Sequence, residues 1–144
     1  MVAYADTSFL FSLYAQDANT PRAAELATAS AGALLLTPLQ RFELRNALRL
    51  SVCRGDMTEG ECRRLLEQIE ADTKTGALAE TPVSWAEVYA EAEALSAAHT
   101  GKTGTRAFDV VHVASAAALG AKTFYTFDAR QKALAAKAGM KVKP

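Results

Sequence analysis

The chain has 144 residues, of which 50% are hydrophobic and 22% are charged, and this suits one globular domain with a sizeable core. Sixteen Lys and Arg residues balance sixteen Asp and Glu residues, so a nucleic-acid partner would need a local basic patch. Cys53 and Cys62 lack the Cys and His companions of a zinc site. The start has no basic segment of a secretion signal, and no apolar run approaches the roughly 18 residues of a membrane span. We therefore expect a single cytoplasmic domain over residues 1–144, away from membranes.

Short apolar runs alternate with longer helical patterns along the chain. Buried parallel strands are predicted at 2–5, 33–37, 123–127 and, more weakly, 141–143. Helices are predicted at 21–30, 39–52, 58–75, 85–99, 108–119 and 129–138. This alternation predicts an α/β fold with a mostly parallel central sheet, in which 58–75 and 85–99 pair as a helical hairpin.

Four acids lie in or beside apolar segments, where an ionised carboxylate needs a partner: Asp6, Glu43, Asp109 and Asp128. Asp6 and Asp128 each follow a predicted strand, and parallel sheets bind ligands beyond the carboxyl ends of their strands. Asp109 lies in the first turn of an apolar helix. Capping of a helix start is the alternative for these three aspartates. Four converging acids with few cationic neighbours favour a divalent metal site for Mg²⁺ or Mn²⁺.

Glu43 is the acid that capping does not explain, because it lies in the middle of a predicted helix. No arginine lies three or four residues away from it to form an intrahelical ion pair. We expect Glu43 to interrupt an inward-facing stripe made of Leu39, Asn46, Ala47 and Leu50. Leu44 and Leu48 form a second apolar stripe, which indicates a dimer contact.

Other catalytic chemistries lack their residues. His112 lies three residues after Asp109 and is a possible donor to the site, but we interpret it as a hydrogen-bonded core histidine. The segment Gly101-Lys102-Thr103 imitates the end of a phosphate-binding loop, yet it lacks the earlier glycine and follows a helix. No nucleophile elbow occurs, and the cysteines are interpreted as small apolar residues.

Four segments together resemble the PIN-domain family, and in particular the VapC-like ribonuclease toxins of toxin-antitoxin pairs: AYADTSFLFSLY, RFELRNALRL, RAFDVVHVASAAALGA and TFYTFDARQKALA. The acids of the family motifs match Asp6, Glu43, Asp109 and Asp128 in order. The resemblance implies a three-layer α/β/α fold, cleavage of RNA with Mg²⁺ or Mn²⁺, a homodimer, and an antitoxin protein that blocks the site. Ser8 stands where some relatives carry Asn.

On this hypothesis Asp6 and Asp109 ligate the metal directly, Asp128 and Glu43 complete the shell, and Ser8 or Thr126 orients a water molecule. Phosphate contacts, or simply solvated side chains, are expected at Arg41, Arg45, Arg49, Lys102, Arg106 and Arg130. An RNA-processing or DNA nuclease of the same fold, and a catalytically silent metal-binding interaction module, remain as alternatives.

Overall fold

The central sheet is parallel throughout, as predicted. The computed structural model describes residues 2–30 and 32–144 and orders the strands of this part β3-β2-β1-β4-β5. The strands are β1 (Ala3–Ala5), β2 (Leu34–Leu36), β3 (Leu78–Glu80), β4 (Thr123–Tyr125) and β5 (Lys141–Lys143). β3 is missing from the prediction, because its sequence Leu-Ala-Glu gives no apolar run.

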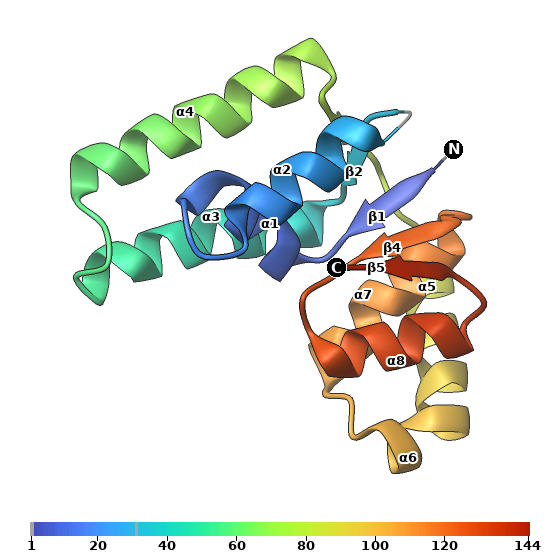
Figure 1. Cartoon of the computed structure of the whole chain (residues 1–144). Coiled ribbons are helices and arrows are strands. Elements are labelled where there is room, and N and C mark those ends of the chain that lie inside the picture. Colours follow the sequence, from blue (N-terminus) through green and yellow to red (C-terminus); the bar gives the residue numbers. More distant parts are fainter. Residues whose placement is uncertain (1, 31) are drawn as a thin grey trace.

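Helices cover both faces of this sheet and make three layers, α/β/α (Figure 1). One face carries α1 (Thr7–Ala15), α2 (Thr20–Ala29), α3 (Pro38–Cys53) and α4 (Glu59–Thr75). The other face carries α5 (Trp85–Leu95), α7 (Ala107–Ala118) and α8 (Ala129–Lys137), with a π-helical turn η1 (Ser96–Thr100) and the short α6 (Gly101–Thr103) between α5 and α7. No described helix is both long and apolar enough to cross a membrane.

Strands β1 and β4 contribute side chains to the cores on both faces of the sheet, because successive side chains of a strand point to opposite faces. In β1, Ala5 belongs to the apolar cluster under α1 to α4, whereas Tyr4 belongs to the cluster under α5, α7 and α8. In β4, Tyr125 and Phe124 divide in the same way. Tyr4 stacks on Phe124, with ring centroids 5.5 Å apart.

Three expectations about the helices are wrong. Leu44 and Leu48 are fully buried in the core beneath α3, so they are not a dimer contact. The stripe around Glu43 is correspondingly not inward-facing, since Leu50 is 41% exposed. The segments 58–75 and 85–99 do not form a hairpin, because β3 lies between them and α5 packs against α7. Two apolar stripes on one helix look alike in sequence, and only the position of the sheet decides which is buried.

Candidate metal centre

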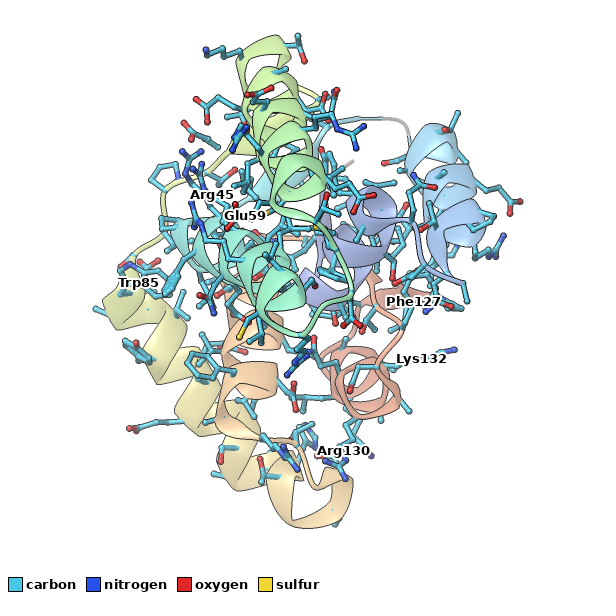
Figure 2. All side chains as sticks on the ribbon, turned by 90° about the vertical axis from the view of Figure 1, so that its left-hand side faces the viewer. Arg45, Glu59, Trp85, Phe127, Arg130 and Lys132 are labelled. Carbon is cyan, nitrogen blue, oxygen red and sulfur yellow. The ribbon has the colours of Figure 1, made fainter. Side chains whose placement is uncertain are left out.

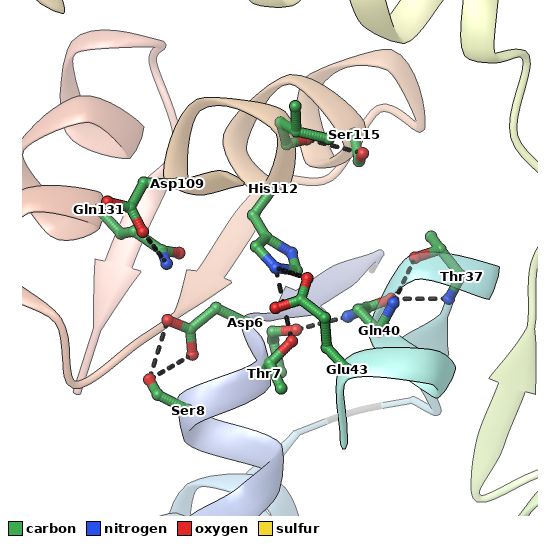
Figure 3. Close-up of polar contacts among 12 residues, drawn as sticks. Asp6, Thr7, Ser8, Thr37, Gln40, Glu43, Asp109, His112, Ser115 and Gln131 are labelled. Atoms are coloured by element: carbon green, nitrogen blue, oxygen red, sulfur yellow. Dashed lines mark hydrogen bonds and ion pairs between the residues drawn. The ribbon is translucent and has the colours of Figure 1, made fainter. Parts of the chain in front are cut away.

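The sheet changes winding direction between β1 and β4, and this point carries the acids. From β1 the chain adds β2 and β3 on one side, then returns to add β4 and β5 on the other. Such a switch point opens a crevice beyond the carboxyl ends of the two central strands. Asp6 directly follows β1, and Asp128 lies three residues beyond the end of β4. Figure 3 shows Asp6 facing this edge together with Glu43 from α3 and Asp109 from α7.

Asp6 is a fully buried carboxylate held by neutral donors. Its oxygens accept hydrogen bonds from the Ser8 hydroxyl at 2.8 and 2.9 Å, the Phe9 amide at 2.8 Å and the Thr126 hydroxyl at 2.6 Å. Burial raises the pKa of the Asp6 carboxyl, and these hydrogen bonds oppose the rise. In residues 2–30 and 32–144 no Lys or Arg forms an ion pair with Asp6. Its charge thus lacks a Lys or Arg counter-ion from this part of the chain.

Asp109 and Asp128 meet at the side chain and backbone of one residue, Gln131. The Gln131 amide nitrogen Nε2 donates to Asp109 Oδ1 at 2.9 Å, and its backbone N–H donates to Asp128 Oδ1 at 2.8 Å. Asp109 Oδ2 also accepts from the backbone of Arg106 at 3.2 Å. The capping alternative is therefore confirmed for these two aspartates, and the Phe9 contact confirms it for Asp6.

Glu43 is held by a buried hydrogen-bond chain through His112. Glu43 Oε1 lies 2.8 Å from His112 Nε2, and His112 Nδ1 lies 2.8 Å from the Tyr4 hydroxyl. Since a carboxylate only accepts, Nε2 carries the proton and Nδ1 accepts from Tyr4 in the neutral ring. Burial raises the pKa of the Tyr4 hydroxyl, which keeps it a donor. His112 is therefore a hydrogen-bonded core residue, as interpreted, and it also fixes the otherwise half-exposed Glu43.

The donor chemistry of this edge fits a hard divalent cation, because its carboxylate oxygens have no Lys or Arg partner among the described residues. The spacing is more open than expected. Within the described ranges, no three His, Cys, Asp or Glu side chains lie close enough together to hold a metal ion. Asp109 and Glu43 each point to a neighbouring side chain instead of a common centre (Figure 3). Ligation by three acids would require a side chain to leave its present hydrogen bond.

Ser8 and Thr126 contact the site through Asp6. Both hydroxyls donate to its carboxylate, and Thr126 Oγ1 also accepts from the Asp128 backbone at 2.9 Å. Their hydrogens are therefore used to hold Asp6 in this structure. Beside Ser8 opens a groove of about 390 Å³, lined among others by Phe11, Arg54 and Phe127.

The expected basic residues separate into two groups. Arg41 forms ion pairs with Glu70 at 3.4 Å and Glu80 at 3.1 Å, and Arg45 lies 3.7 Å from Glu70. These partially exposed pairs connect α3 with α4 and β3. Figure 2 shows Arg45 beside α4, far from Arg130 on α8. In the described part of the chain no ion pair engages Arg49, Lys102, Arg106 or Arg130.

Sequence reasoning missed the role of Gln131 and underrated His112. The signal for His112 was its position one helical turn after Asp109, which places both on nearly the same face. Gln131 lies three residues after Asp128, where the first turn of a helix meets its cap. Tyr4 carried no signal, since an aromatic residue in a buried strand is ordinary core.

A three-layer α/β protein with acids at the switch point of a parallel sheet is the class that the fold and this edge define. The chain matches the PIN domain family over residues 3–137, and it belongs to this family. Comparison with curated protein sequences gives no significant match.

Solved structures of VapC toxins and of their complexes share this fold. VapC20 from Mycobacterium tuberculosis, a toxin that cleaves the sarcin-ricin loop, is 19% identical, with a TM-score of 0.68 and 99% of each chain covered. VapBC2 from Rickettsia felis, bound to a DNA fragment from its promoter, is 13% identical, with a TM-score of 0.65 over 99% of this chain and 98% of that one. VapBC-1 from nontypeable Haemophilus influenzae is 15% identical, with a TM-score of 0.64 over 99% and 97%.

Proposed function

We propose that this protein is a divalent-metal-dependent endoribonuclease, the toxin of a toxin-antitoxin pair, which hydrolyses RNA phosphodiester bonds at the β1/β4 edge. The observation that carries the proposal is the fully buried Asp6 carboxylate, which has no Lys or Arg counter-ion in the described part of the chain. A divalent cation bound beside Asp6 would compensate this buried charge. Membership of the PIN domain family and the fold shared with the sarcin-ricin-loop-cleaving VapC20 support a nuclease role.

Asp6 and Asp109 are proposed to hold Mg²⁺ or Mn²⁺, with Asp128 and Glu43 completing the site directly or through water. When bound, the cation supplies an acidified water and neutralises charge on the phosphoryl oxygens. The chain's own residues prepare the ligands. Ser8 and Thr126 fix the orientation of the Asp6 carboxylate.

His112 fixes the orientation of the Glu43 carboxylate through its Nε2, and the Tyr4 hydroxyl contacts the other ring nitrogen of His112, Nδ1. No histidine is required as a base in this scheme, because the carboxylates and the cation carry the chemistry. His112 is a positioning residue.

The RNA backbone is proposed to cross the α6 to α8 side of the edge. Lys102, Arg106 and Arg130 are exposed there and form no ion pair within the described residues, so they are available to phosphates. Arg41 and Arg45 are poorer candidates because Glu70 and Glu80 already neutralise them. The cleavage rate of an Arg130→Ala variant should fall more steeply than that of Arg41→Ala when the RNA concentration is lowered at constant salt. This difference would report a loss of RNA affinity in Arg130→Ala.

A homodimer and an antitoxin are the proposed protein partners. The VapBC structures support an antitoxin by analogy of fold. Since Leu44 and Leu48 belong to the core, the proposed contacts are the exposed aromatics Tyr89, 58% exposed, and Phe108, 65% exposed, on the packed helices α5 and α7. Light scattering should give the mass of a dimer, and Phe108→Ser should shift it toward the monomer. A monomeric wild-type protein would contradict the dimer.

The deciding experiment is cleavage of matched labelled RNAs and DNAs by purified protein with Mn²⁺ or Mg²⁺. Cleavage should be specific for RNA, disappear with EDTA, and disappear in Asp6→Asn. Asp56→Asn, in an exposed loop away from the edge, is the matched control and should cleave as the wild type does.

Two results would change the proposal. Cleavage of DNA alone would indicate a DNA nuclease of the same fold. A folded protein that binds Mn²⁺ and cleaves nothing would indicate the silent interaction module.

A further inference from the structure

Gln131 has one polar atom that the fold leaves without a partner. The residue is only 7% exposed at the start of α8. Its Nε2 holds Asp109 and its backbone N–H holds Asp128, as described above. Among the described residues its Oε1 is the buried side-chain nitrogen or oxygen atom that has no hydrogen-bond partner.

The orientation of this amide follows from its contact. Turning the carboxamide over would set Oε1 against the Asp109 carboxylate, two acceptors facing each other, so Nε2 must face Asp109. Oε1 then points away from Asp109. In Figure 3 the carboxamide of Gln131 lies on the side of Asp109 that faces Asp6.

A buried acceptor in this position requires a donor or a cation. Leaving it unpaired costs about 1–3 kcal/mol, whereas an apolar residue at the same position would avoid that cost. Amide carbonyl oxygens are hard ligands of the same type as carboxylate oxygens, and they bind Mg²⁺ or Mn²⁺ without adding a negative charge. Near several acids, a neutral ligand avoids further repulsion.

We propose that the Gln131 carboxamide oxygen is a further ligand of the divalent cation at the β1/β4 edge, while its Nε2 positions Asp109. The proposal rests on the proposed function only for the presence of that cation. It gives the edge an oxygen donor in addition to the four acids, at a place where three acids alone do not converge.

The test is the dissociation constant for Mn²⁺, measured by isothermal titration calorimetry on the full chain without RNA. Gln131→Met keeps the length of the side chain but removes both the donor and the acceptor, and it should weaken Mn²⁺ binding by about 10–100-fold. Gln131→Glu also loses the donor to Asp109 but keeps an oxygen ligand, so it should bind Mn²⁺ more tightly than Gln131→Met does. Gln68→Met is the matched control, since Gln68 Nε2 also donates to an aspartate, Asp72, at 2.8 Å, but on exposed α4. It should bind as the wild type does.

Each outcome separates this proposal from the proposed function. Unchanged Mn²⁺ binding in Gln131→Met would overturn the ligand role. Equal weakening in Gln131→Met and Gln131→Glu would also overturn it, because the residue would then act only by holding Asp109. Absence of Mn²⁺ binding by the wild type would overturn both proposals. Normal Mn²⁺ binding that depends on Gln131, without cleavage of RNA, would support the ligand and contradict the nuclease alone.

Discussion

Replacing Tyr4 by Phe tests the hydrogen-bond chain that fixes Glu43. The substitution keeps the ring, which stacks on Phe124 at 5.5 Å, and removes only the hydroxyl that lies 2.8 Å from His112 Nδ1. His112 is 2% exposed, so water cannot readily replace the lost partner. A buried acceptor left unsatisfied costs about 1–3 kcal/mol. That is a large part of the total stability of roughly 5–15 kcal/mol expected for a domain.

Urea unfolding in the presence of EDTA measures this loss without a contribution from bound metal. With a slope of about 1–3 kcal/mol per molar urea, a loss of about 2 kcal/mol moves the midpoint down by roughly 1 M. The control is Tyr89→Phe, which removes the same hydroxyl from a side chain that is 58% exposed and should change stability by less than about 0.5 kcal/mol.

Coupling to Glu43 follows from the same geometry. In a double-mutant cycle, Tyr4→Phe and Glu43→Gln should show an interaction free energy of about 0.5–3 kcal/mol, because both partners act on the one ring of His112. A Tyr4→Phe protein as stable as Tyr89→Phe, or additive effects in the cycle, would refute the hydrogen-bond chain.

Three further outcomes are expected. Thr126→Val removes a hydroxyl that serves both Asp6 and the backbone after it, and urea unfolding should show a loss of about 1–3 kcal/mol, against almost none for exposed Thr75→Val. Because burial raises the pKa of Asp6 in the folded state, the metal-free protein should lose stability as pH rises from the unfolded pKa, about 4, through the folded one. Asp6→Asn should remove that loss, so its stability relative to the wild type should be greater at about pH 8 than at about pH 4; an equal difference at both values would contradict the buried charge. Leu48→Ala should lower the free energy of unfolding by about 2–5 kcal/mol, because it opens a cavity in the core. If Leu48→Ala instead dissociated a dimer and left the stability unchanged, Leu48 would be a dimer contact after all.

The sequence alone determined the fold class and the elements that carry the acids. Its apolar runs predicted four of the strands within one or two residues of their observed ends, because buried parallel strands need continuous apolar residues. The placement of Asp6 and Asp128 after strands predicted that they share one edge, which the strand order bears out. β3 escaped prediction because hydrogen bonding to β2, rather than its own composition, makes it a strand.

Only the tertiary structure decided what each side chain contacts. Which stripe of α3 is buried depends on where the sheet lies, and this reversed the parts expected of Leu48 and Leu50. The contacts of Glu43 with His112 and of Gln131 with Asp109 join residues 69 and 22 positions apart. Local periodicity fixes the face on which a residue lies, but the partner across the site is set by the packing of separate elements, and no spacing in the sequence encodes that distance.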